Sequence, residues 1–369
     1  MLVSTNITNS PEDVARYRDA ADMRAFLDAF GLDGLELMPM PGDSRLHCIP
    51  PERVVGLHLP FFTSWVDFWN GDEEALMREY GDWDTVRMVF GGDTPGAIIE
   101  MLRGMLDFGK ALNVKYVVLH VSNVMVDECL ADRCAHSDEA VCAATAELVN
   151  RLNEGRDDPF DFLLENLWWP GLTMTRPEIT RDLMAAIRAP RKGIMLDTGH
   201  LLHTNRDLAG ESEAVDYILR RLDEHGAAAG WVRGMHLHQS LTGAWTRRTL
   251  AAGLDASGDY WTRFGHAMEY VLGVDRHEPF SEGAARRLVA RVAPDYLTHE
   301  FITPDRRTHE GYLERQGVGK REGLGNREEW RGNREQGTGS REQGTGSREQ
   351  EWQLARYPVA ATICRHLRE

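Results

Sequence analysis

Cysteine is scarce in this sequence. The 369 residues include five cysteines, an odd number, and none of them forms a C-x-x-C pair. Disulfide frameworks are typical of small secreted domains, so we interpret these side chains as reduced thiols of a cytoplasmic protein. Cys129, Cys134, His136 and Cys142 lie close together along the chain, but their spacing fits no standard zinc site.

Long apolar runs and an excess of basic residues are also missing. No stretch reaches the roughly 18 residues of a membrane-spanning helix, and the N-terminus lacks a signal-peptide layout. Lys and Arg number 42 against 58 Asp and Glu, which gives a net charge of −16. Phosphate backbones bind clustered basic residues, so DNA and membrane surfaces are disfavoured and a small-molecule substrate is expected. The sequence carries no signal for the oligomeric state.

Residues 1–310 alternate short β-rich runs with longer helical patterns. Most of the β-rich runs are continuously apolar, as is typical of parallel strands buried on both faces. No G-x-G-x-x-G follows the first run, so dinucleotide binding has no support. Eight β-then-α units predict a (β/α)8 TIM barrel, with a doubly wound open sheet as the alternative. The predicted strands are 2–7, 34–38, 54–58, 114–120, 161–165, 193–197, 231–237 and 295–302.

A repeat sets the end of the chain apart. Residues 317–351 contain the heptad REQGTGS twice in tandem, at Arg334–Ser340 and Arg341–Ser347, and have almost nothing apolar to bury. We expect a disordered low-complexity insertion there. Residues 352–369 then place apolar residues at helical spacing, which predicts a C-terminal helix that packs on the barrel.

Metal-ligand side chains stand at the ends of the predicted strands. From the third strand onward, the strands end in or carry His58, His120, Glu165, Asp197, His236 and Glu300. The adjacent loops add His200, Asp275 and His277. Each alone has an ordinary explanation, such as a helix N-cap or a hydrogen-bonded core residue. Buried together at one rim they would be costly without cations. Imidazoles and carboxylates suit Zn²⁺, Mn²⁺, Fe²⁺ or Co²⁺, and nine ligands predict two or three ions.

These residues resemble a known family. D-T-G-H at Asp197–His200, D-R-H-E at Asp275–Glu278 followed by S-E-G, and the strand-end ligands are similar to the endonuclease IV group. That group, also called AP endonuclease family 2, belongs to the xylose-isomerase-like TIM-barrel superfamily, and the resemblance covers about residues 2–305. It implies a trinuclear zinc site that cleaves a phosphodiester without a protein nucleophile. The implied ligand sets are His58, His120 and Glu165; Glu165, Asp197, His236 and Glu300; and His200, Asp275 and His277.

Sugar isomerases and epimerases of the same superfamily offer an alternative. They resemble this chain in the second set alone, which would hold one divalent ion while Glu165 and Glu300 exchange the substrate proton as catalytic residues. His200 would contact the sugar there, but a mononuclear isomerase has no need of His58, His120, Asp275 and His277, so these favour a multinuclear phosphodiesterase. A third hypothesis is a non-catalytic barrel that serves as a binding module. The complete ligand sets argue against it.

The sequence departs from a DNA-repair pattern in its charge and its aromatic residues. The chain is acidic, and no basic loop lies beside the predicted site. Trp65 follows the third strand and Trp168 follows the fifth, where they could stack on a bulky ligand. We therefore expect a small organic phosphodiester as substrate and DNA as an improbable one. Arg276, His238, Trp168 and Trp65 are the candidate substrate-binding residues.

Overall fold

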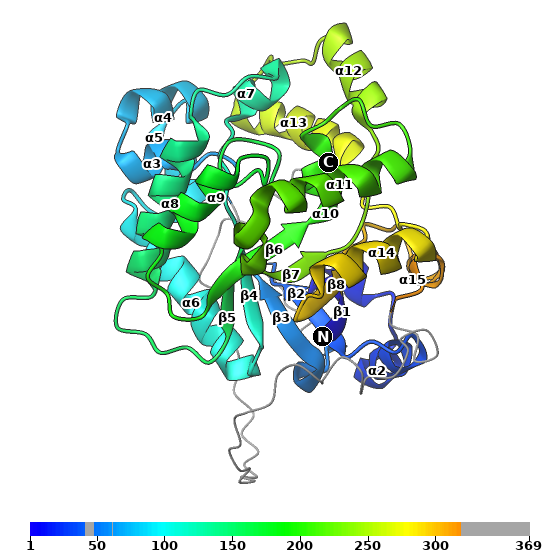
Figure 1. Cartoon of the computed structure of the whole chain (residues 1–369). Coiled ribbons are helices and arrows are strands. Elements are labelled where there is room, and N and C mark those ends of the chain that lie inside the picture. The colour runs from blue at the N-terminus through cyan, green and yellow to red at the C-terminus, as the bar shows by residue number, and fades with distance from the viewer. Residues whose placement is uncertain (41–47, 61, 319–369) are drawn as a thin grey trace.

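Eight parallel strands close into a barrel in chain order, with helices around it (Figure 1). The computed structural model describes residues 1–40, 48–60 and 62–318. The predicted (β/α)8 barrel is confirmed, whereas the predicted insertion at 317–351 and closing helix at 352–369 lie almost entirely outside the described residues. The strands are β1 (Leu2–Thr8), β2 (Gly34–Met38), β3 (Val54–His58), β4 (Tyr116–His120), β5 (Asp161–Glu165), β6 (Lys192–Asp197), β7 (Val232–His236) and β8 (Tyr296–His299).

The eighth strand is shorter than predicted. It ends at His299, so Glu300 lies in the loop beyond the strand rather than within it. The side chain of Asn6 on β1 explains why the strand ends there, because its amide forms hydrogen bonds with both the backbone N–H and the backbone carbonyl of Phe301. Asn6 Oδ1 accepts from Phe301 N at 3.0 Å, and Asn6 Nδ2 donates to Phe301 O at 3.1 Å.

Helices follow the strands and cover the outside of the barrel. Several begin at a serine or aspartate N-cap: the side chains of Ser137, Ser281 and Asp305 each accept a backbone N–H in the first helical turn. No helix in the described part of the chain is long and apolar enough to cross a bilayer. The covering helices are α2 (Ala20–Ala29), α6 (Gly96–Leu112), α8 (Asp138–Leu152), α9 (Pro177–Ala186), α11 (Glu211–His225), α14 (Glu282–Val292) and α15 (Arg306–Gln316).

Further helices lie in the connections, and those that follow a strand build up the end of the barrel where the strands' carboxyl ends meet, which we call the mouth. In the connection between β7 and β8, α13 (Tyr260–Val274) packs against α7 (Val126–Ala131), which belongs to the connection between β4 and β5. Both helices lie beyond the strand arrows in Figure 1. The run after His58 that carries Trp65 contains a helix, α3 (Val66–Asn70). These elements are α1 (Pro11–Val14), η2 (Pro51–Arg53), α3 (Val66–Asn70), α4 (Glu73–Tyr80), α5 (Trp83–Phe90), α7 (Val126–Ala131), α10 (Thr198–His203), η3 (Gly226–Trp231), α12 (Gly243–Ala252) and α13 (Tyr260–Val274).

Large side chains fill the barrel interior, and glycines on neighbouring strands make room for them. Tyr116 and Met195 belong to a small, fully buried cluster separate from the main core. A Cβ at Gly56 would lie 2.2 Å from the Tyr116 ring, and one at Gly234 would lie 2.6 Å from the sulfur of Met195. The interior is therefore a packed core rather than a pore, and polar groups gather at the mouth.

Candidate metal centre

Strand register brings the predicted ligands together at the mouth. His120 on β4 pairs directly with Glu165 on β5, and Asp197 on β6 pairs with His236 on β7. The ligand atoms group within 4.8 Å of one another in three sets that coincide with those implied by the resemblance. The sets are His58, His120 and Glu165; Glu165, Asp197, His236 and Glu300; and His200, Asp275 and His277.

Glu165 stands between the first two sets and divides its carboxylate between them. Its Oε2 lies 3.0 Å from Nε2 of His58 and 3.1 Å from Nε2 of His120. Its Oε1 lies 3.2 Å from Nδ1 of His236 and 3.3 Å from Nδ1 of His200. A fully buried carboxylate with one oxygen turned to each set has the arrangement of a bridging ligand.

The third set is organised around Asp275. Its Oδ2 lies 3.1 Å from Nε2 of His200 and 2.8 Å from Nε2 of His277. Its other oxygen accepts from Ser240 Oγ at 2.9 Å and faces Nε2 of His203 at 3.1 Å. His277 adopts φ 50°, in the left-handed region that costs energy for a non-glycine residue. The surrounding contacts therefore hold His277 in place at some backbone strain.

Three of the histidines share one orientation. Each places Nδ1 against a backbone carbonyl: His58 on Leu59 O at 2.9 Å, His200 on Asn166 O at 2.9 Å and His277 on Glu300 O at 3.2 Å. A carbonyl only accepts, so Nδ1 carries a hydrogen, and Nε2 is the nitrogen that faces the carboxylates and can bind a cation. Histidines that bind metals are oriented in this way.

The sequence D-T-G-H has a separate structural reason at each position. Asp197 caps α10 by accepting from His200 N at 2.6 Å while its other oxygen faces the centre. The Thr198 hydroxyl lies 2.9 Å from His236 O and joins α10 to β7. A Cβ at Gly199 would lie 2.0 Å from Cε1 of His238, so only glycine leaves room for that ring.

Burial and charge oppose each other throughout the centre. Burial disfavours the charged form of Glu165, but the imidazoles of His120 and His236 outweigh it and hold the pKa of that carboxyl well below its usual range. Burial likewise favours neutral His277, but Asp275 raises the pKa of that imidazole to about 9. Ionised carboxylates thus face imidazoles without water between them, and a divalent cation can take the place of the protons.

The spacing of the ligand atoms fits a metal. In a tetrahedral zinc site with bonds of about 2.0–2.1 Å, two ligand atoms lie about 3.3 Å apart. The nitrogen–oxygen separations run from 2.8 Å in the third set to 3.7 Å between Nδ1 of His236 and Asp197 Oδ2 in the second. Imidazoles and carboxylates without a thiolate suit zinc, manganese, iron or cobalt.

Two further residues reach the centre, and sequence reasoning gave neither a ligand role. Glu36 groups with His58, His236 and Glu300, and His238 groups with His277 and Glu300. His238, expected to bind substrate, is fully buried, with Nε2 2.8 Å from Asp197 Oδ2 and its ring stacked 3.9 Å from that of His277. The H-x-H spacing pointed to His238, and the position of Glu36 on the second predicted strand indicated a residue that could orient a ligand or form a structural salt bridge.

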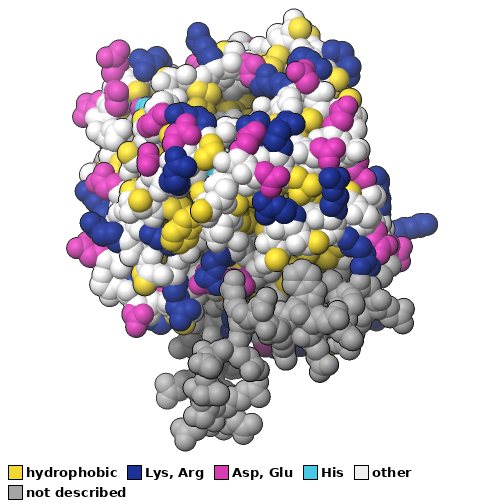
Figure 2. All heavy atoms as spheres, viewed as in Figure 1, with side chains coloured by type: hydrophobic (Ala, Val, Ile, Leu, Met, Phe, Trp, Pro, Cys, Tyr) yellow, Lys and Arg dark blue, Asp and Glu magenta, His cyan; other side chains and the backbone are white. Residues whose placement is uncertain are grey.

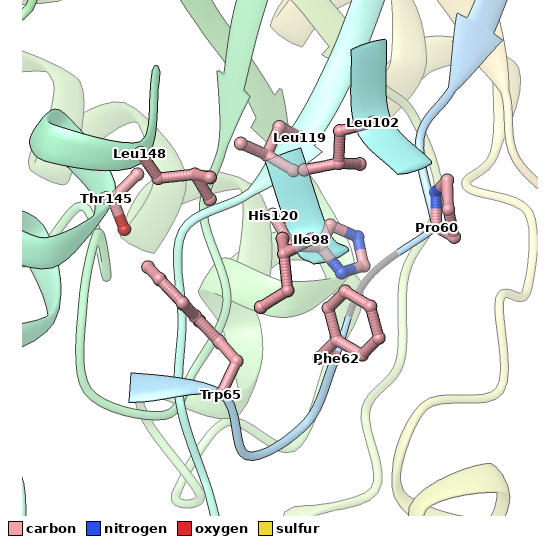
Figure 3. A pocket seen from close by; sticks show the side chains of 9 residues that line it. All are labelled: Pro60, Phe62, Trp65, Ile98, Leu102, Leu119, His120, Thr145 and Leu148. Atoms are coloured by element: carbon pink, nitrogen blue, oxygen red, sulfur yellow. The ribbon is translucent and has the colours of Figure 1, made fainter. Parts of the chain in front are cut away.

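The other expected substrate-binding residues occupy different positions. Trp168 is half-buried beside the third set, with its ring centroid 5.3 Å from that of His200. Arg276 is exposed between two ligands. Trp65 is only 5% exposed and donates Nε1–H to Ser122 O at 2.9 Å. Its ring and that of His120 line a small, largely apolar pocket (Figure 3).

Fold and site together define a TIM barrel with a buried imidazole–carboxylate centre at its mouth. The chain belongs to the xylose isomerase-like TIM barrel family, whose model matches residues 91–311. No curated protein matches the chain by sequence.

Solved structures of proteins with several activities are similar to this chain at low sequence identity. Endonuclease IV from Thermus thermophilus is 16% identical, with a TM-score of 0.43 over 86% of this chain and 98% of that one. A putative xylose isomerase from Rhodospirillum rubrum is 13% identical, with a TM-score of 0.47 over 86% and 96%. D-allulose 3-epimerase from a Methylomonas species is 14% identical, with a TM-score of 0.40 over 85% and 89%.

Proposed function

We propose that the protein is a metal-dependent phosphodiesterase that acts on a small organic phosphodiester. Two or three divalent cations, zinc first among them, would occupy the three ligand sets. Glu165 would bridge the first two, and Glu165 and Glu300 would be the carboxylates nearest the reacting atoms.

The observation that carries this proposal is that the second ligand set is accompanied by two others, the first set and the third set. His58 and His120 converge on one oxygen of Glu165 while the second set uses the other oxygen. His200 and His277 converge on Asp275. A reaction that needs one cation has no use for these additional imidazoles, whereas phosphodiester cleavage uses several cations at once.

The chain's own side chains would divide the remaining work. Bound cations would supply Lewis-acid activation of a water molecule and neutralise charge on the phosphate oxygens. Arg276, exposed between two ligands, is placed to contact a phosphate from the solvent side. The half-buried ring of Trp168 beside His200 offers a flat surface for the organic part of the substrate.

Charge supports a small substrate over duplex DNA. The net charge is −16, and Figure 2 shows Lys and Arg interspersed with Asp and Glu on the viewed face rather than gathered into a basic surface. Tight binding of a duplex relies on many phosphate contacts from basic residues. A single phosphodiester can be bound by the cations themselves.

A mononuclear sugar isomerase or epimerase is the second candidate, because the second set alone suffices for it. There, Glu165 and Glu300 both face Nδ1 of His236, at 3.2 and 3.1 Å, so two carboxylates flank one position. Such a pair can hold one cation and exchange a proton at a substrate carbon.

Hydrolysis of bis-p-nitrophenyl phosphate by the zinc-loaded protein tests the proposal. We expect turnover that disappears on chelation and in His277→Ala and His120→Ala, since each variant removes a ligand that only the multinuclear site needs. Ketose–aldose exchange is measured on the same samples. Exchange activity that survives both substitutions, without diester cleavage, would establish the isomerase instead. If the protein binds no metal and catalyses neither reaction, the result would support the non-catalytic binding module.

A further inference from the structure

Glu36 is a buried carboxylate inside the barrel that no proposed reaction step uses. It lies on β2 and is 1% exposed. Its Oε1 lies 3.0 Å from Nε2 of His236 on β7. Its Oε2 accepts hydrogen bonds from Tyr116 OH on β4 at 2.7 Å and from Thr298 Oγ1 on β8 at 2.9 Å. A carboxylate is retained in such a place when its lone pairs are satisfied, as they are here.

The contact with Glu36 determines which nitrogen of His236 faces the centre. A carboxylate only accepts, so Nε2 carries a hydrogen toward Glu36, and Nδ1 is the nitrogen turned toward the ligand carboxylates and left for a cation. Nδ1 lies 3.2 Å from Glu165 Oε1 and 3.1 Å from Glu300 Oε2. His58, His200 and His277 have the opposite orientation, with Nε2 toward the centre and Nδ1 on a backbone carbonyl.

His236 therefore differs from these three in its ligand atom and in its support. A carboxylate withdraws the Nε2 hydrogen more strongly than a neutral carbonyl does, so the ring becomes a stronger donor at Nδ1. The hydroxyls of Tyr116 and Thr298 hold Glu36 from the far side, and their oxygens lie 3.0 Å apart. The contacts form a continuous path from the barrel interior to the second ligand set.

We propose that Glu36 is the positioning residue of His236: it fixes Nδ1 as the ligand atom and makes the second set the tightest of the three cation positions. This inference rests on the proposed metal centre. It concerns only the order in which the sets hold cations and the residue responsible for that order.

Glu36→Gln tests the role of the charge. Glutamine has the same length, its carbonyl can accept from Nε2 of His236, and its amide can donate to either hydroxyl. We expect the most tightly held Zn²⁺ of the wild type to bind about 10–100-fold more weakly in this variant, as for other supporting partners of metal ligands. Competition with a chelator of known affinity, read by zinc content, measures this change.

Tyr116→Phe is the matched control, because it removes one donor to Glu36 and leaves the contact between Glu36 and His236. We expect its zinc affinities to stay close to those of the wild type. Thermal unfolding of the metal-free proteins accompanies the titration. A purely structural role for Glu36 would lower the melting temperature and leave the tightest zinc affinity unchanged, which would overturn the inference.

Nitrogen-15 spectra of histidine-labelled, zinc-loaded protein provide a second readout. We expect the ring assigned to His236 to bind through Nδ1 and those of His58, His200 and His277 to bind through Nε2. Binding of His236 through Nε2 would make Glu36 a ligand or a bystander and overturn the inference. If the wild type holds no Zn²⁺ at all, the proposed function fails. If it holds Zn²⁺ and Glu36→Gln changes nothing, only the positioning role fails.

Discussion

Two groups of buried histidines occupy the same barrel and have opposite surroundings. Those at the mouth face carboxylates: Nε2 of His58 lies 3.0 Å from Glu165, and Nε2 of His277 lies 2.8 Å from Asp275. Those in the outer layer, between strands and helices, face neutral partners. His299 contacts Val318 O and the Gln316 amide, each at 2.7 Å.

The other outer-layer histidines repeat this arrangement. His309 lies 2.9 Å from the Thr5 hydroxyl and 3.3 Å from that of Thr303. His225 places Nδ1 on Arg221 O at 2.7 Å and Nε2 on the Thr180 hydroxyl at 3.0 Å. Each of these rings is satisfied as a neutral imidazole with one donor and one acceptor. Burial alone therefore does not mark a metal ligand; convergence of imidazoles on ionised carboxylates does.

The largest expected difference between the mouth and the rest of the barrel is that between substitutions of two carboxylates on one strand. Glu165→Gln at the mouth end of β5 removes a charge shared by two ligand sets, so diester hydrolysis should fall by at least about 10²–10³-fold, with loss of bound zinc. Asp161→Asn at the other end of β5 affects only a pair with Arg233 at 2.7 Å and a contact with Tyr296. We expect a lower melting temperature there and unchanged zinc content. Equal zinc loss in both variants would contradict this assignment.

Substitution of one histidine at the mouth and one in the outer layer tests the same comparison, with smaller expected effects. His200→Ala removes a ligand of the third set and should lower the zinc content of the purified protein. His309→Ala removes an outer-layer ring together with its contacts to the Thr5 and Thr303 hydroxyls, so unfolding should become easier by about 1–3 kcal/mol. Its zinc content should equal that of the wild type. The pair is measured by metal analysis and chemical denaturation, and reversed outcomes would refute the division.

The outer-layer histidines also predict a pH dependence. Burial and nearby Arg16 lower the pKa of His309 to about 3, and burial lowers the pKa of His299 to about 4. In the unfolded chain both titrate near 6.5. Between these values the unfolded state binds more protons, so stability is lost as the pH falls from about 6.5 toward 4. Each group contributes a slope of up to about 1.4 kcal/mol per pH unit.

His309→Gln isolates that contribution. Glutamine keeps polar atoms near Thr5 and does not titrate, so the variant should lose less stability than the wild type between pH 6.5 and 4. Denaturant unfolding of both chelated proteins at several pH values gives the difference in slope. Parallel curves for the two proteins would show that His309 is protonated with equal ease in both states.

The sequence was most informative where strand ends coincide with chemistry. Apolar runs that stop on His58, His120, Glu165, Asp197 and His236 predict both the strands and the place where these side chains meet, because parallel strands of a barrel end at one rim. The placement of Glu300 just beyond β8 was not predictable in this way, since it depends on the side chain of Asn6 replacing the strand ladder.

Other features of the centre depend on geometry that no local pattern encodes. Glu36 lies beside a shift in register between β2 and β3, and its contact with His236 on β7 crosses the barrel. His203 reaches Asp275 only because α10 turns it to the same side as His200. The tautomer of each ring follows from carbonyls brought near by the fold. The sequence could therefore identify most of the candidate ligands, but not how their side chains are oriented.

Counting the bound ions tests the central claim most directly. Wild-type protein and Asp275→Ala are loaded with Zn²⁺, freed of weakly bound metal and analysed for zinc per chain. The three ligand sets predict close to three ions in the wild type and one fewer in Asp275→Ala, with the diester activity lost alongside. A single ion in both proteins would contradict the account and leave only the second set, Glu165, Asp197, His236 and Glu300, as a metal site.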